Sequence, residues 1–139
     1  MDTINNFMKK LKVLIPIILL TSLSACDKKP DNQKIMIDEV MAIHDEVMPK
    51  MDEIMSLKSS LDSASKVSPD SVKARELSSA LEVADNKMMD WMEEYNPDLL
   101  KGKSADEITK YYADEKAKIS GVKDLTDKSI EDAKAFLSK

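Results

Sequence analysis

The chain has 139 residues, with 21 lysines and arginines against 26 aspartates and glutamates, so its formal net charge is −5. An acidic body lacks the electrostatic footprint that binds nucleic acid or an anionic lipid surface, and we therefore expect no nucleic-acid partner. The single cysteine excludes an internal disulfide, so a domain of this size must be held together by packing.

The N-terminal 25 residues have the order of a secretory signal peptide. Three lysines precede an apolar core from Val13 to Leu20, and a short polar stretch follows. The alternative is an uncleaved membrane helix. The 13 residues from Val13 to Ala25 are fewer than the roughly 20 that a spanning helix needs, so we predict a signal peptide over residues 1–25.

The tetrapeptide LSAC at positions 23–26 resembles the lipobox of bacterial lipoproteins, whose cysteine becomes the acylated first residue of the mature chain. The resemblance implies that Cys26 carries lipid and anchors the chain in a bilayer. Residues 26–34 then comprise the lipidated cysteine and a polar tether, and residues 35–139 form the folded part. We expect a lipid-anchored protein of the cell envelope, at the outer membrane, although Asp27 resembles an inner-membrane retention signal of some bacteria.

Apolar residues from Ile35 to Leu61 recur in alternating steps of three and four, which predicts a helix with a heptad seam. The seam consists of Ile37, Val40, His44, Val47, Met51, Ile54, Lys58 and Leu61. A second row, expected to widen the buried stripe, consists of Met41, Met48 and Met55. Because the periodicity is unchanged on both sides of Pro49, we expect a kink just after His44 and not a break.

A second helix is expected to begin at Ser68, which would act as N-cap with Pro69 at the first helical position. The sequence NPD at 96–98 ends it. Its apolar stripe consists of Val72 or Ala74, then Leu77, Leu81, Ala84, Met88, Trp91 and Tyr95, with Met92 alongside.

Ser104 and Glu107 have capping-box spacing and open a third helix. Gly121 and the polar residues 124–127 weaken its pattern, so one long helix and two shorter ones both fit. Its apolar residues are Ile108, Tyr111, Tyr112, Ile119, Val122, Ile130, Ala133, Phe136 and Leu137.

No stretch alternates with period two, so we predict an all-α, up-down-up three-helix bundle: an antiparallel hairpin plus a third helix, continuous or broken. With the first turn near Lys66, residue i faces residue 132 − i. His44 should then lie opposite Met88, and Met41 opposite Trp91, which brings the two methionine-rich segments together.

Four segments spread over the predicted mature chain resemble small helical lipoproteins of Bacteroidetes that are sometimes labelled "viral A-type inclusion protein". They are HDEVMPKM at 44–51, MMDWM at 88–92, NPDLLKGKSADEI at 96–108 and SIEDAKAFL at 129–137. The resemblance implies a lipidated, all-helical protein and carries over no activity.

One hypothesis for the methionine-rich segments is a soft-metal site. Thioether sulfur with one imidazole suits Cu(I) or Ag(I), and Trp91 could stack over the bound cation. The candidate ligands are His44, Met41, Met48 and Met51 on one helical face, and Met88 and Met92 on the facing helix. The alternative is that methionines at heptad spacing simply fill the core, in which case there is no cofactor.

Catalysis is not expected. His44 and Asp45 are consecutive helical residues that point about 100° apart, so we expect them not to pair. Gly102 and Gly121 fit no phosphate-binding loop. The acidic pairs that recur every seven residues in the first helix are typical of a solvated helix face.

The remaining hypothesis is a structural or protein-interaction module that binds an envelope protein or a second copy of itself, and we rank it first. The best contact candidates are the aromatic residues Trp91, Tyr95, Tyr111 and Tyr112. The alternative is that these rings close the end of the bundle. A Cu(I)- or Ag(I)-binding protein is the second choice.

Overall fold

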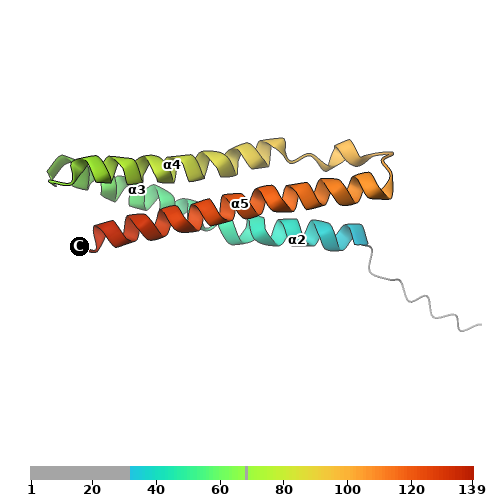
Figure 1. Cartoon of the computed structure of the whole chain (residues 1–139), viewed down its shortest axis with the longest axis horizontal. Helices are drawn as coiled ribbons and strands as arrows, with labels where there is room; N and C mark the ends of the chain where they lie inside the picture. Colours follow the sequence, from blue (N-terminus) through green and yellow to red (C-terminus); the bar gives the residue numbers. More distant parts are fainter. Residues whose placement is uncertain (1–31, 68) are drawn as a thin grey trace, which may run out of the picture.

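A computed structural model of the chain describes residues 32–67 and 69–139 (Figure 1). The predicted signal peptide, Cys26 and most of the tether lie outside these residues, as does Ser68. The helices are α2 (Asn32–Val47), α3 (Lys50–Val67), α4 (Ser71–Glu94), the short 3-10 helix η1 (Pro97–Leu100) and α5 (Ala105–Leu137). The described residues contain no strand, so the predicted all-α class is confirmed.

The chain runs along the molecule three times, first as α2 and α3, then as α4, and finally as α5 (Figure 1). α3 packs on α4 and α5, whereas α2 packs chiefly on α5. The start of α2 and the connection from α4 to α5 lie at one end of the molecule, and the C-terminus lies at the other. With 33 residues, α5 is about 50 Å long at 1.5 Å per residue.

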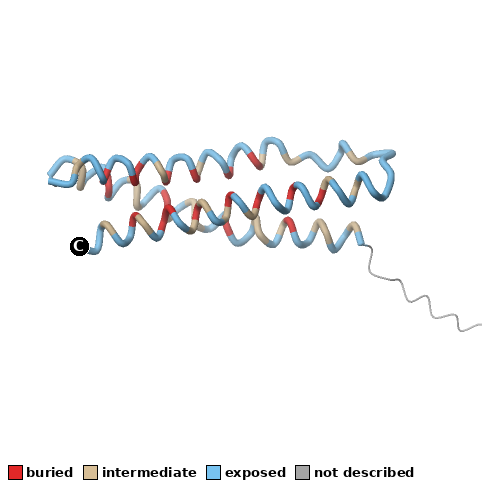
Figure 2. The backbone as a smooth tube through the Cα atoms, in the orientation of Figure 1, coloured by how far each residue is buried: buried red, intermediate tan, exposed pale blue. Residues whose placement is uncertain are grey.

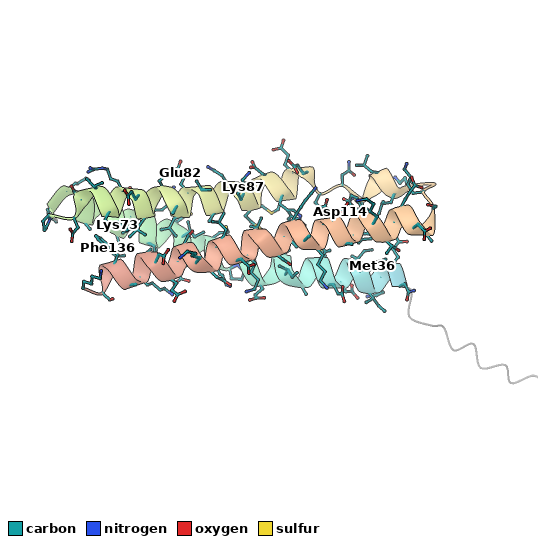
Figure 3. All side chains as sticks on the ribbon, viewed as in Figure 1. Met36, Lys73, Glu82, Lys87, Asp114 and Phe136 are labelled. Atoms are coloured by element: carbon teal, nitrogen blue, oxygen red, sulfur yellow. The ribbon has the colours of Figure 1, made fainter. Side chains whose placement is uncertain are left out.

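Buried residues follow the sides of the helices that face one another (Figure 2). In the first pass the predicted seam is confirmed, since its valines, Ile54 and Leu61 are fully buried and its polar members His44 and Lys58 are half-buried. In α4, Ala74 and not Val72 continues the stripe. Charged side chains such as Lys73, Glu82 and Lys87 project from α4 into solvent (Figure 3).

The expectation that the second methionine row widens the core is wrong. Met48 and Met55 are 36% and 66% exposed, and Met41 is half-buried. Each lies one position outside the seam, on a flank that the other described helices cover only partly or not at all.

Pro49 produces a break and not the predicted kink. α2 ends at Val47 and α3 begins at Lys50, with Met48 and Pro49 in a turn between them. Pro49 has no N–H to donate, and the N–H of Met51 bonds to the carbonyl of Met48, three residues back, at 3.1 Å. The regular ladder is therefore lost for one turn, although the apolar seam continues across it.

The hairpin turn lies later than predicted. α3 continues to Val67, and α4 starts at Ser71, two residues after Pro69. Lys58 pairs with Glu82 at 3.7 Å and Asp62 accepts a hydrogen bond from Ser78 at 3.0 Å, so residue i faces 140 − i in this half.

The third pass is one continuous helix. Its N-terminus has the predicted capping box, in which the Ser104 hydroxyl and the Glu107 carboxylate each bond to the other residue's backbone N–H. These bonds, with help from Lys103, lower the pKa of Glu107 to about 2. Gly121 does not interrupt α5. The gap in its apolar pattern is filled by buried polar residues that continue the three-four spacing, namely Glu115, Thr126 and Ser129.

Four charged residues bridge the break at Pro49. Nζ of Lys50 lies 2.5 Å from Oδ1 of Asp127, and Nζ of Lys123 lies 2.7 Å from Oδ2 of the same carboxylate. Nζ of Lys123 also lies 3.1 Å from Oε1 of Glu46. The two lysines hold the pKa of Asp127 below its usual value, and the hydrogen bond to Asp127 is the main cause of the raised pKa of Lys123. This ring ties α2 and α3 to the same stretch of α5.

Candidate functional site

The side chain of Trp91 anchors the half of the bundle that contains α2. Trp91 is only 4% exposed, and its indole N–H donates a hydrogen bond to Oε2 of Glu115 at 3.0 Å. The second carboxylate oxygen of Glu115 lies 2.9 Å from Nζ of Lys118. A buried carboxylate requires such partners, since an unpaired charge in the core is costly. The Trp91–Glu115–Lys118 group is therefore a satisfied polar network that joins α4 to α5.

Five rings form a continuous series across this half of the molecule. His44 lies 5.8 Å from Trp91, and Tyr95 stacks on Trp91 at 5.0 Å between ring centroids. Tyr111 lies 6.3 Å from Tyr95 and meets Tyr112 edge-on at 5.3 Å. The series joins α2 to α4 and α5, and the two segments that we predicted to meet do meet. The His44 ring contacts Trp91, which is three residues after Met88, the residue that the predicted register places opposite His44.

The aromatic residues predicted to contact a partner are mostly internal. Trp91 and Tyr112 are 4% and 2% exposed, whereas Tyr95 and Tyr111 are half-buried. The Tyr111 hydroxyl accepts a hydrogen bond from the N–H of Asn96 at 3.0 Å, which fixes the chain where it leaves α4. Burial is the main cause of the raised pKa of both Tyr95 and Tyr111, so both phenols stay protonated at neutral pH. Of these four rings, Tyr95 and Tyr111 are the two that reach the surface.

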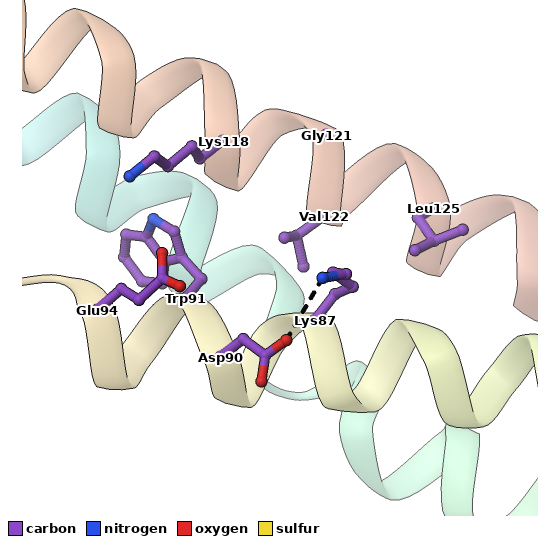
Figure 4. A pocket seen from close by; sticks show the side chains of 8 residues that line it. All are labelled: Lys87, Asp90, Trp91, Glu94, Lys118, Gly121, Val122 and Leu125. Atoms are coloured by element: carbon purple, nitrogen blue, oxygen red, sulfur yellow. Dashed lines mark hydrogen bonds and ion pairs between the residues drawn. The ribbon is translucent and has the colours of Figure 1, made fainter.

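A surface groove of about 380 Å³ lies beside Trp91, between α4 and α5 (Figure 4). Lys87 and Asp90 form one rim, with Nζ of Lys87 3.4 Å from Oδ2 of Asp90. Lys118 reaches over the groove from α5. The full lining consists of Lys87, Asp90, Trp91, Glu94, Lys118, Gly121, Val122 and Leu125. The groove therefore combines an apolar floor with two cations and two anions at its edges.

Trp91 is the one groove residue that we predicted from the sequence as a binding residue. A weak signal was present in Gly121, a glycine within a helical stretch, which is uncommon without a reason. The pairing of Gly121 with residues 87–94 of another helix depends on the packing of α4 on α5, which no local pattern encodes.

The six predicted metal ligands do not share one environment. Met88 is fully buried in the apolar cluster around Trp91, and Met51 and Met92 are half-buried against that cluster. Met41 and Met48 lie outside it, and the His44 side chain is 20% exposed. The structure thus separates three core methionines from two near the surface.

The expectation that His44 and Asp45 do not pair is wrong. Nδ1 of His44 lies 2.9 Å from Oδ1 of Asp45, because the imidazole is long enough to reach the neighbouring carboxylate from the next position on the helix. Within residues 32–67 and 69–139, no three side chains from His, Cys, Asp and Glu gather in a group that could hold a metal ion. None of the helices described is long and apolar enough to cross a bilayer.

Comparisons of the chain with protein-family models, with curated proteins and with solved structures found no match to any of them.

Proposed function

We propose that this chain is a lipid-tethered, non-catalytic protein of the cell envelope, an up-down-up three-helix bundle that binds another envelope protein through the groove between α4 and α5. The observation that carries the binding proposal is Gly121 at the edge of that groove. The proposal places the chain among the small helical lipoproteins that its sequence resembles.

The lipid anchor is supported by the signal-like N-terminus and by Cys26 at the end of LSAC. The described part of α2 starts at Asn32, three residues before the predicted start of the folded part, and five residues of the sequence lie between Asn32 and Cys26. Five residues span at most about 18 Å. The end of the bundle that holds the start of α2 and the connection to α5 would then face the bilayer (Figure 1).

The non-catalytic role is supported by the surroundings of His44, the single histidine, and of Glu115, the buried acid. His44 bonds to the exposed carboxylate of Asp45 and lies against Trp91. Glu115, the buried acid, is held by the indole N–H and by Lys118. Neither arrangement places a nucleophile next to a base, which acyl or phosphoryl transfer would need.

The binding role of the groove is supported by the presence of a glycine at position 121, where it lowers the stability of the helix. A glycine inside a helix is about 1 kcal/mol less favourable than alanine. Gly121 does not have the positive φ that would require glycine, and a Cβ added there would meet nothing within 4 Å. Neither the backbone nor the packing of the described residues explains the glycine. The close approach of a group from outside does explain it.

We propose a helix of another protein as the occupant. Ala113 and Ala117 precede Gly121 at four-residue spacing on α5, and all three are exposed, so a partner helix can approach this backbone closely. An apolar side chain of that helix would enter the groove over Val122 and Leu125, and its charged residues would pair with Lys87, Asp90, Glu94 and Lys118. The exposed Lys87–Asp90 pair is weak and can exchange partners at little cost.

The proposal is tested by placing a photo-crosslinking amino acid at Leu125 of the full chain and irradiating native membranes. The matched control is Lys116, which lies on the same helix but pairs with Glu39 of α2. We expect one product at Leu125, of the mass of the chain plus another envelope protein, and none at Lys116. Gly121→Leu should abolish the crosslinked product at Leu125, because the leucine side chain fills the edge of the groove.

A crosslinked product of twice the chain mass would show that the occupant of the groove is a second copy of this chain and not another protein. Equal products at both positions, or none at Leu125, would contradict the groove as a binding site. The anchor is tested separately with Cys26→Ser, which should abolish incorporation of radioactive palmitate and release the chain from membranes.

A further inference from the structure

We infer that His44, Met41 and Met48 form a binding site for one soft monovalent cation, Cu(I) or Ag(I), on the surface of α2 just before the break at Pro49. The site is narrower than the six-ligand set suggested by the sequence, because the structure assigns the other three methionines to the core. It does not depend on the groove between α4 and α5.

The imidazole of His44 is oriented for metal binding by its neighbour. An ionised carboxylate can only accept hydrogen bonds, so the 2.9 Å contact with Asp45 requires the proton on Nδ1. In the neutral ring, Nε2 then carries the free lone pair. Metal-binding histidines almost always donate their other N–H to a carboxylate, carbonyl or water in this way, which fixes the tautomer and raises the basicity of the ligand.

Two thioethers lie one helical turn to either side of this imidazole. Met41 is three residues before His44 and Met48 is four after it, offsets that place side chains on the same helix face. The N–H of Met48 bonds to the carbonyl of His44 at 2.9 Å, so the four-residue helical spacing is kept although Met48 lies beyond the end of α2. The three side chains can therefore converge above His44.

The two sulfurs are not used by the core. Met48 is 36% exposed, and Met41, although half-buried, does not pack on either apolar cluster of the bundle. Met88, in contrast, is fully buried, and a cation on it would have to displace packed side chains. Met41 and Met48 are therefore at least partly exposed to solvent and do not pack on the apolar clusters.

The ligand set determines the class of ion. Two thioethers and one neutral imidazole suit a soft d¹⁰ cation and disfavour Zn(II) or Mg(II), which prefer harder or charged ligands. Trp91 lies 5.8 Å from the His44 ring, so a cation on that ring should change the fluorescence of this single tryptophan.

The test uses the full chain in detergent with Cys26→Ser, which removes the sulfur of the single cysteine as a competing soft ligand. Ag(I) alone and Cu(I) alone are titrated against a chromogenic chelator, with Trp91 fluorescence as a second readout. The site variants are His44→Gln and the pair Met41→Leu with Met48→Leu. The matched control is the pair Met55→Leu with Met89→Leu, two exposed methionines that are not among the three proposed ligands. Circular dichroism checks that every variant keeps its helices.

We expect one equivalent of either ion to bind, with at least tenfold weaker binding in both site variants and unchanged binding in the control. Asp45→Asn, which leaves all three ligands in place, should weaken binding about tenfold through the loss of orientation. Site variants that bind as tightly as the parent chain would overturn the inference. So would an equal loss in the control pair, which would indicate diffuse binding by methionines, or tighter binding of Zn(II) than of Ag(I).

Discussion

The two halves of the bundle differ in the size of the side chains that fill them. Around α3 the core contains three alanines among aliphatic residues, and its buried members are Ile54, Leu61, Ala74, Leu77, Leu81, Ala84, Ile130 and Ala133. Around α2 the core contains the large rings of Trp91 and Tyr112 and the long side chain of Met88. Small side chains allow helices to approach closely, whereas large ones hold them apart.

This difference explains how the first pass changes neighbours. α3 packs closely on α4, where Ala74 and Ala84 face it, whereas α2 packs chiefly on α5. The break at Pro49 lies between the two arrangements, and Met51 packs against both clusters. The half with large rings also contains the Trp91–Glu115–Lys118 network, Met41 and Met48, and most of the residues that line the groove. The two proposed sites lie in this half because its core leaves side chains and surface that packing does not use.

The largest expected effect is in the α3 half. Leu81 is fully buried there, so Leu81→Ala should lower the free energy of unfolding by about 2–5 kcal/mol, since the closely packed neighbours cannot collapse into the cavity. Urea unfolding followed by circular dichroism measures it. Val83→Ala, at a site 47% exposed, is the control and should change stability by less than about 0.5 kcal/mol. Equal effects of the two substitutions would remove the distinction between core and surface in this half.

In the α2 half the test concerns a polar contact. Glu115→Ala leaves the buried indole N–H of Trp91 without its acceptor, and should cost about 1–3 kcal/mol. Glu115→Gln keeps an oxygen acceptor and should cost less. Urea unfolding followed by Trp91 fluorescence compares the variants. A Gln variant as unstable as the Ala variant would show that the contact with Lys118, and not the indole bond, is the important one.

A substitution at the edge of the groove should change the free energy of unfolding by a smaller amount and in the opposite direction. Gly121→Ala should raise the free energy of unfolding by about 0.5–1 kcal/mol, because α5 gains helix propensity and the added methyl group meets nothing. Thermal or urea unfolding of the isolated chain measures this. A destabilised Gly121→Ala variant would mean that the fold itself requires glycine at this position.

The smallest effect concerns the charged ring at the break between the halves. The pKa of Asp127 is lowered in the folded state, so its stabilising contribution is present above the unfolded value of 3.8 and is lost as the pH falls through the folded value. Asp127→Asn should therefore be less stable than the parent at pH 7, by about 0.5 kcal/mol because the carboxylate is 39% exposed. Urea midpoints at pH 7, 5 and 3 should show the difference shrinking below pH 4. A difference that is the same at pH 7 and pH 3 would contradict an ionic role for Asp127.

Much of the secondary structure could be predicted because its signals are local. The seam from Ile37 to Leu61, the stop at NPD and the capping box at Ser104 each depend on residues within a few positions of one another. The buried polar residues of α5 were missed because an apolar pattern does not include Glu115 or Thr126, although both fit its spacing. Their burial becomes visible only with the groups beside them, such as the indole N–H of Trp91.

The sequence by itself determined that the described chain is helical and which side of each helix faces inward, because a repeat of three and four residues defines one face of a helix. Tertiary structure alone decided that Pro49 breaks the first pass, that Trp91 and Tyr112 are internal, and that Met41 and Met48 stay outside the core. It also created the groove at Gly121. The physical reason is that a helix pattern specifies which residues seek burial, whereas the neighbouring helices and their side-chain sizes decide which flanks are covered.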